Sequence, residues 1–319
     1  MEIEKLIFYH HPCLDGSTAA WAALQAFGYD NTAYVGFTHD QDDVLLKAID
    51  DYVTEKTIVY FCDIVPPRPI LEMLPEKAGK VIIYDHHVSA EKMLKNFSHP
   101  KCEIVFDMNR SGAGLTWDML HPEKPRPFVI DLVEAMDLYR TDTLGSRQDF
   151  FSFAAGMDTL PVKDFKAFAE EFSQLAGSDD ERALLSARGH ERRDIYLSRI
   201  KNVLADLQYV TLPGLEALEG CEVGFIRGDI RSFGREFWFR FQEVCDRDRK
   251  VVMLCRDEPD GKSIAISFRS TPETDVSCAA EEIGSKYGIS GGGHRNAAAA
   301  RLTKEQFESL VEKWNLPIS

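Results

Sequence analysis

Histidine and aspartate residues gather in the first half of the chain, each set directly after an apolar run. Carboxylate oxygens suit hard divalent cations, and imidazole nitrogens extend the range to Mn²⁺ and Fe²⁺. Two such ions, ~3.5–4 Å apart, can clamp a phosphoryl group and activate a water molecule for hydrolysis. The pattern therefore predicts a two-metal site for phosphoryl chemistry. The residues concerned are His10, His11 and Asp15; Asp63; Asp85, His86 and His87; and Asp107.

These side chains can meet only if the apolar runs form neighbouring strands that point the same way. Helical patterns separate the runs, and strand–helix alternation with short connections predicts a doubly wound, mostly parallel sheet with helices on both faces. Ligands of such sheets bind beyond the carboxyl ends of the strands, which is where the ionisable residues stand. The predicted strands span residues 5–10, 33–37, 57–64, 80–87 and 102–108.

The second half of the chain has a different pattern. Helical periodicity fills residues 126–208 and ends in a long charged segment, after which strand patterns return. A long charged helix commonly bridges two domains, and a chain of 319 residues is long enough for two cores. We therefore expect an α/β metal-binding domain over residues 1–185, a linker helix over 186–210 and a smaller α/β domain over 211–319.

The composition excludes several classes of protein. No stretch of ~20 apolar residues and no apolar leader segment occurs, so we expect a cytoplasmic protein without a membrane partner. The net charge of −15 argues against long duplex nucleic acid and favours a small phosphorylated nucleotide or a short single-stranded oligonucleotide. The seven cysteines lack zinc-finger spacing, which favours reduced thiols. A homodimer remains open.

Several motifs, in the right order, resemble the DHH phosphoesterase superfamily. YDHHVS follows an H-x-x-x-D-G segment and a strand-end aspartate, and GGGHRNAAAA, preceded by ISFRS, is similar to the DHH-associated C-terminal domain. Together the motifs span almost the whole chain. The superfamily includes RecJ-type exonucleases, nano-RNases, cyclic-dinucleotide phosphodiesterases, family II pyrophosphatases and polyphosphatases. The resemblance therefore implies a metal-dependent phosphoesterase.

The resemblance also implies a set of metal ligands. Adjacent strand residues point to opposite faces of a sheet, so His10 and His11 are not both expected to bind metal. The H-x-x-x-D spacing selects His11 and leaves His10 as a packed or hydrogen-bonded neighbour. The implied ligands are His11, Asp15, Asp63, His86 and Asp137, with Asp63 bridging two ions.

Two further residues of the DHH motif are expected to act beside the metals. His87 would face the substrate phosphate or the leaving oxygen, and Asp85 would orient the adjacent imidazoles. Relatives carry another aspartate where this chain has Ser17 or Cys13, and neither substitute is an equivalent hard ligand. We therefore expect the second ion to bind more weakly than the first, and Mn²⁺ to be the cofactor, with Mg²⁺ or Co²⁺ as substitutes.

A glycine-rich segment near the C-terminus is expected to contact substrate. Glycines let the backbone approach an anion and present N–H groups to it, and an arginine can grip a phosphate with two hydrogen bonds. Residues 109–117 are a second candidate, because Ser111 is typical of a helix N-cap beside exposed N–H groups. The aromatic stretch REFWFRFQ has helical spacing that favours core packing over base stacking. The candidate contacts are Arg269, Gly291, Gly292, Gly293, His294, Asn296, Arg110 and Ser111.

These expectations converge on a phosphodiesterase for short substrates. A second domain that closes on the first would limit substrate length, so linear dinucleotides of the pGpG or pApA type, or nanoRNA, are the predicted substrates. Nucleoside monophosphates would be the products of a two-metal hydrolysis. Two alternatives are an inorganic pyrophosphatase or polyphosphatase, against which the GGGH motif counts, and a degenerate nucleotide-binding scaffold.

Overall fold

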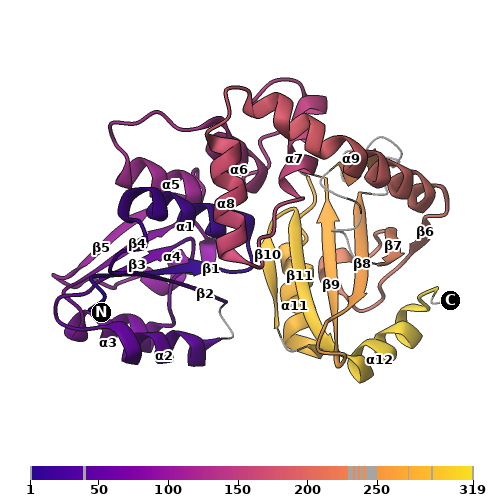
Figure 1. The fold of residues 1–319 in the computed structure, drawn as a ribbon. Coiled ribbons are helices and arrows are strands. Elements are labelled where there is room, and N and C mark those ends of the chain that lie inside the picture. Colours follow the sequence, from indigo (N-terminus) through magenta and orange to yellow (C-terminus); the bar gives the residue numbers. More distant parts are fainter. Residues whose placement is uncertain are drawn as a thin grey trace. The chain divides into compact units, whose positions relative to one another are not determined.

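Parallel strands form the sheet of the first of two units in the computed structural model of the chain (Figure 1). The units are Met1–His190 and Glu191–Ser319. The structure describes residues 2–38, 41–228, 233, 236–237, 240–241, 250–271, 273–288 and 290–317. The strands of the first unit are β1 (Lys5–His10), β2 (Thr32–Phe37), β3 (Ile58–Cys62), β4 (Lys80–Asp85) and β5 (Cys102–Phe106). Their order, β2-β1-β3-β4-β5, and their parallel pairing confirm the predicted α/β sheet.

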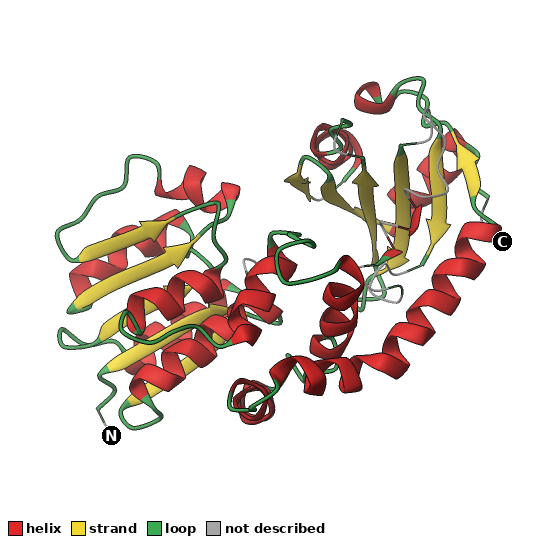
Figure 2. Cartoon of the chain, turned by 90° about the horizontal axis from the view of Figure 1, so that it is seen from above, coloured by secondary structure: helices red, strands yellow, loops and turns green. Residues whose placement is uncertain are grey.

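Helices cover both faces of this sheet, as Figures 1 and 2 show from two directions. The helices that pack on it are α1 (Leu14–Phe27), α2 (Asp42–Tyr52), α3 (Arg68–Lys77), α4 (Val88–Leu94), α5 (Gly112–Leu120) and α8 (Phe165–Ala176). Three further helices are α6 (Phe128–Asp137), α7 (Arg147–Met157) and α9 (Glu181–Ala205). Side chains of a strand alternate between the two faces. In β1, Leu6 and Phe8 pack with α2, α3 and α4, whereas Ile7 and Tyr9 pack with α1, α5 and α8. Burial on both faces explains the continuous apolar runs of the sequence.

The strand order determines where a ligand can bind. β1 lies between β2 and β3, so the chain proceeds in opposite directions across the sheet on either side of the β1–β3 pair. Open α/β sheets bind ligands at such a switch point, beyond the carboxyl ends of the strands. The register pairs Tyr9 with Cys62 and Cys62 with Tyr84, which sets the ends of β1, β3 and β4 level with one another. The residues that follow these three strands therefore meet at one edge.

The second unit contains a mixed sheet. Its strands are β6 (Gln208–Val210), β7 (Val223–Arg227), β8 (Val251–Asp257), β9 (Ser263–Ser270), β10 (Ser290–His294) and β11 (Ala297–Thr303), in the order β10-β11-β9-β8-β7-β6. One face packs against α11 (Ser277–Tyr287), α12 (Lys304–Trp314) and the short 3₁₀ helix η1 (Glu216–Leu218). The end of α9 packs on the other face through Ile200. The boundary between the units, at His190, falls inside the helix predicted as the linker.

Three expectations about burial and bonding can be checked on the described residues. Phe237 and Phe241 are fully buried, which confirms core packing for these two aromatics, whereas Trp238 and Phe239 lie outside the described residues. The cysteines of the described part are free thiols, and Cys245 lies outside it. Among the described helices, none combines the length and the apolar character that crossing a bilayer requires.

Candidate metal centre

The imidazole of His86 lies among three carboxylates. Its Nε2 atom is 3.2 Å from Oδ1 of Asp63, 3.6 Å from Oδ2 of Asp15 and 3.5 Å from Oδ2 of Asp137. The four residues come from four segments: the ends of β3 and β4, the first turn of α1 and the last residue of α6. Asp15, Asp63 and His86 are buried, and Asp137 is partly exposed. The fold thus brings four of the five predicted metal ligands together.

Asp63 is the residue that faces both sides of this site. It directly follows β3 with a left-handed backbone (φ 65°), a conformation that aspartate tolerates better than most residues. Oδ1 faces His86 at 3.2 Å, and Oδ2 faces Nδ1 of His10 at 3.5 Å. Burial raises the pKa of Asp63, but the neighbouring imidazoles outweigh burial, so the net pKa lies below its usual value. The carboxylate is therefore ionised and points toward two groups of ligands.

Asp15 is fixed by the start of helix α5. Its two carboxylate oxygens accept hydrogen bonds from the backbone N–H groups of Gly112 (2.7 Å) and Ala113 (3.0 Å). A side chain at Gly112 would prevent this approach, because a Cβ there would lie 2.4 Å from Cβ of Asp63. Burial, together with the charges of Asp63 and Asp137, raises the pKa of Asp15 well above its usual value. A cation in the site would relieve this repulsion.

Asp85 organises the two histidines of the DHH motif. Its Oδ1 atom accepts hydrogen bonds from the backbone N–H groups of His86 (2.6 Å) and His87 (2.8 Å) and lies 2.9 Å from Nδ1 of His87. Burial lowers the pKa of His87, but the hydrogen bond to Asp85 and the charge of Asp63 outweigh it and raise the pKa to about 9. His87 is therefore protonated at neutral pH, and Asp85 has the geometry expected of an orienting carboxylate.

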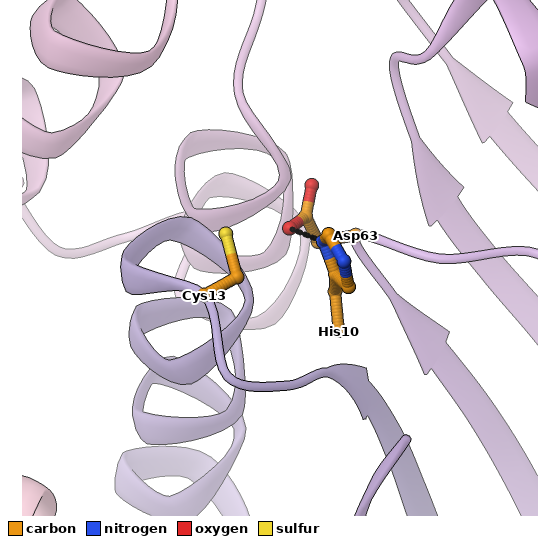
Figure 3. Close-up of side chains that lie close together, drawn as sticks. All are labelled: His10, Cys13 and Asp63. Atoms are coloured by element: carbon orange, nitrogen blue, oxygen red, sulfur yellow. Dashed lines mark ion pairs between the residues drawn. The ribbon is translucent and has the colours of Figure 1, made fainter. Parts of the chain in front are cut away.

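Within the described part of the chain, the structure places His10, and not His11, in a group of potential metal ligands. His10, the last residue of β1, belongs to a group with Cys13 and Asp63 whose ligand atoms all lie within 4.8 Å of one another (Figure 3). The ring of His11 packs edge-on against Tyr9 and lies over Gly36. His11 belongs to none of the metal-ligand groups found among the described residues. The Nδ1 atom of His11 is buried and makes no hydrogen bond within the described part of the chain, so the role of His11 as a metal ligand stays a prediction.

The arrangement fits divalent cations. Three groups offer ligand atoms at the spacing of a metal site: His10, Cys13 and Asp63; Asp15, His86 and Asp137; and Asp63, His86 and His87. Asp63 and Asp85 each keep one buried carboxylate oxygen that accepts no hydrogen bond from the described part of the chain. Buried oxygens without a partner are costly unless a ligand satisfies them. Two neighbouring ions that share Asp63 would satisfy this requirement at that residue.

Metal binding is expected to strengthen as the pH rises. Burial lowers the pKa of His86, but Asp63 and Asp137 outweigh it, so the pKa of His86 is raised, as is that of Asp15. A group with a raised pKa holds a proton that the metal must displace before it can bind. The protonated group stabilises the metal-free protein at low pH, and this stabilisation is lost as the pH rises through the raised pKa. The difference in Tm with and without Mn²⁺ should therefore widen above about pH 6.5, the ordinary histidine value. Thermal melts across pH test this, and a constant difference would contradict it.

Three comparisons with known proteins bear on this geometry. A family model described as the DHHA1 domain matches residues 243–316. RecJ from Thermus thermophilus, solved with Mn²⁺, is 14% identical with a TM-score of 0.53 and covers 98% of this chain and 51% of its own. A pGpG-specific phosphodiesterase, PggH from Vibrio cholerae, is 14% identical with a TM-score of 0.51 and covers 97% of this chain and 96% of its own. The second unit therefore contains a DHHA1 domain, and the two solved structures share the fold of this chain.

A curated relative matches over most of the chain. It is the uncharacterized protein R106 of Acanthamoeba polyphaga mimivirus, 23% identical over 311 residues that make up 92% of this chain. The chain spans 66% of the length of R106 and about half of the RecJ chain. The DHHA1 match lies within the second unit and covers much of it.

Two glycines of the DHHA1 domain, Gly291 and Gly293, are required by close packing. A Cβ at Gly291 would lie 1.9 Å from the carbonyl oxygen of Ala280 on α11. Gly293 has a φ of 144° and faces the backbone of the partner strand β11 at close range. Gly292 has open space, since Glu281 is its one neighbour within 4 Å among the described residues. The side chain of His294 lies outside the described part of the chain, so its substrate contact stays a prediction.

An alanine at Gly291 is expected to destabilise the DHHA1 domain by about 2–3 kcal/mol, since β10 or α11 must move to admit the methyl group. Gly292→Ala is the matched variant, because it adds the same atom in open space and costs about 1 kcal/mol through its backbone conformation alone. Urea denaturation measures both. Equal losses would contradict the packing explanation, and a raised KM in the Gly292→Ala protein would identify a substrate contact.

Asn296 and Arg269 have partners within the DHHA1 domain. The side-chain amide of Asn296 donates to Oγ of Ser270 and to the backbone oxygens of Thr271 and Thr274, at 2.6–3.1 Å. These bonds stabilise the turn after β9, and the substrate contact of Asn296 stays a prediction. Arg269 is partly buried on β9 and donates to the backbone oxygen of the preceding residue at 2.7 Å. Its contact with substrate stays a prediction.

Arg110 and Ser111 also have a structural partner, Glu134, which the sequence analysis did not single out. Oε2 of Glu134 accepts from Nε of Arg110 (3.0 Å) and from the backbone N–H of Ser111 (3.1 Å). Ser111 caps α5 as predicted, by accepting from the backbone N–H of Gly114. The backbone N–H groups of Ser111, Gly112 and Ala113 thus already have carboxylate partners, Glu134 and Asp15, and the substrate contacts of Arg110 and Ser111 stay predictions. Glu134 stands one turn before Asp137 on α6, and this helical spacing could have indicated that both side chains face the site.

Proposed function

We propose that this protein is a metal-dependent phosphodiesterase that hydrolyses linear dinucleotides or very short oligonucleotides to nucleoside monophosphates. The observation that carries the proposal is the meeting of Asp15, Asp63, His86 and Asp137 at the switch point of the sheet. Carboxylate and imidazole ligands without thiolate suit Mn²⁺ or Mg²⁺ at the Asp15–His86–Asp137 group. Bound divalent ions would supply Lewis acidity toward the phosphoryl oxygens and activate a water molecule.

The residues around the metals have distinct tasks in this proposal. Asp63 holds the two ligand groups at a fixed separation, because its two oxygens face His86 and His10. Asp85 keeps the ring of His87 turned so that Nδ1 faces the carboxylate and Nε2 points away from it. His87 is protonated at neutral pH, so it can donate a hydrogen bond or a proton to the leaving oxygen. Arg269 and Gly292 are the proposed contacts of the DHHA1 domain with substrate.

Two properties support a short substrate. The net charge of −15 disfavours binding along an extended phosphate backbone. One structural neighbour of nearly equal extent, with 96% of its chain covered, is named a pGpG-specific phosphodiesterase, whereas the RecJ chain from Thermus thermophilus is about twice as long.

A substrate panel tests the proposal. Purified protein with Mn²⁺ should convert 5′-phosphorylated linear dinucleotides such as pGpG and pApA to mononucleotides, and the rate should fall as the oligonucleotide lengthens from two to five residues. Cyclic dinucleotides, inorganic pyrophosphate and polyphosphate complete the panel. Preferred release of inorganic phosphate from pyrophosphate or polyphosphate would identify the alternative enzyme. Absence of turnover with Mn²⁺, Mg²⁺ and Co²⁺ on every substrate would leave a nucleotide-binding scaffold.

A further inference from the structure

Cys13 stands where a helix cap would be expected but does no capping. It occupies the N-cap position of α1, and its side chain makes no capping hydrogen bond. Its sulfur instead lies within 4.8 Å of the ligand atoms of His10 and Asp63 (Figure 3). The three side chains come from three places: the last residue of β1, the N-cap of α1 and the residue that follows β3. The sulfur is thus part of a three-donor group.

A second observation indicates that this group has room for a ligand. Oδ2 of Asp63 is the oxygen that faces His10, and its side chain is 1% exposed. The atom accepts no hydrogen bond from the described part of the chain. The partner of this oxygen in the metal-free protein is Nδ1 of His10 at 3.5 Å, and a metal ion held by both atoms and by Sγ of Cys13 would take the place of that contact.

The donor set determines which metal fits. Mg²⁺ and Mn²⁺ favour oxygen ligands, whereas a thiolate beside an imidazole favours Zn²⁺, Co²⁺ and Fe²⁺. The neighbouring group of Asp15, His86 and Asp137 contains no sulfur and keeps the opposite preference. The two halves of the centre therefore differ in the softness of their ligands, although both face Asp63.

We infer that Cys13 binds metal as a thiolate with His10 and Asp63, so that this half of the centre selects a thiophilic divalent ion of the Zn²⁺, Co²⁺ or Fe²⁺ class. On binding, a sulfur–metal bond forms and the thiol proton passes to solvent, without oxidation or reduction. The inference rests on the metal centre of the proposed function and deepens it. It makes the centre a mixed one, with the oxygen-rich group occupied by Mn²⁺ or Mg²⁺.

Cobalt provides a direct test, because a Co²⁺–thiolate bond gives a near-ultraviolet charge-transfer absorption that oxygen and nitrogen ligands do not give. Titrating the metal-free full-length protein with Co²⁺ should produce this band together with the visible d–d bands. In Cys13→Ser the charge-transfer band should disappear, the d–d bands should remain, and the Zn²⁺ affinity should fall by at least about 100-fold. Cys13→Asp should shift the preference of the site from Zn²⁺ toward Mn²⁺.

Cys102→Ser is the matched control. Cys102 begins β5, at the opposite end of the sheet, and belongs to none of the groups found in the described residues, so its variant should keep the wild-type spectrum. Wild-type d–d bands without a charge-transfer band would overturn the thiolate and leave the proposed function standing. A failure to bind Co²⁺ at all, by spectroscopy and by calorimetry, would overturn both.

Discussion

Replacing Asp63 with asparagine is expected to lower kcat/KM for a linear dinucleotide by at least about 1,000-fold while the protein stays folded. Asp63 is the one residue of the described chain whose two oxygens face both groups of ligands, toward His86 at 3.2 Å and toward His10 at 3.5 Å. Asparagine keeps the shape of the side chain and tolerates the left-handed backbone at φ 65°, so it removes the charge with little strain. Alanine is less informative, because its left-handed backbone at this position would also lower the stability of the protein by about 1 kcal/mol.

Asp107→Asn is the control for this variant. Asp107 follows the neighbouring strand β5, yet its carboxylate accepts hydrogen bonds from Asn109 and belongs to none of the metal-ligand groups of the described residues. Its activity and its Mn²⁺-dependent rise in Tm should match those of the wild type. Steady-state kinetics and thermal melts with and without Mn²⁺ measure both variants. An Asp63→Asn protein with more than about a tenth of wild-type activity would show that the site is misassigned.

The second large effect is a difference in metal affinity between variants of the adjacent residues His10 and His11. His10→Gln is expected to weaken metal binding by at least about 100-fold and to lower the rate with it, because Nδ1 of His10 faces Asp63. His11→Gln should leave the metal affinity nearly unchanged and should lower Tm, because the ring packs against Tyr9 and over Gly36. Calorimetric titration with Zn²⁺ and Mn²⁺, with thermal melts of the metal-free proteins, distinguishes the two. The reverse order of affinities would restore His11 as the ligand.

The sheet and its functional edge were predictable because they depend on short-range patterns. Apolar runs that alternate with helical segments predict parallel strands, and the ligands of parallel strands meet at their carboxyl ends. Asp63 and His86 could be placed on this basis alone. Asp137 could not, because it stands at the end of a helix rather than a strand, and only the resemblance pointed to it. The structure supplies the reason, since α6 ends beside His86.

What the sequence could not provide is the geometry of turns and of close packing. The choice between His10 and His11 depends on the path of the chain between β1 and α1, which residue spacing does not describe. The glycine-rich segment resembles an anion-binding loop, but the requirement at Gly291 comes from a carbonyl group on α11. Asn296 has donors suited to a ligand, and its backbone partners became visible only in three dimensions.

The bonds between Asp15 and the start of α5 have a consequence for the order of assembly. Three carboxylates face one another at the centre, and without counter-charge they would repel. The N–H groups of Gly112 and Ala113 provide part of that counter-charge within the chain itself, and the nearby carboxylates raise the pKa of His86. We therefore expect the metal-free chain to fold without its ions, and each ion that binds to compete with protons at the site.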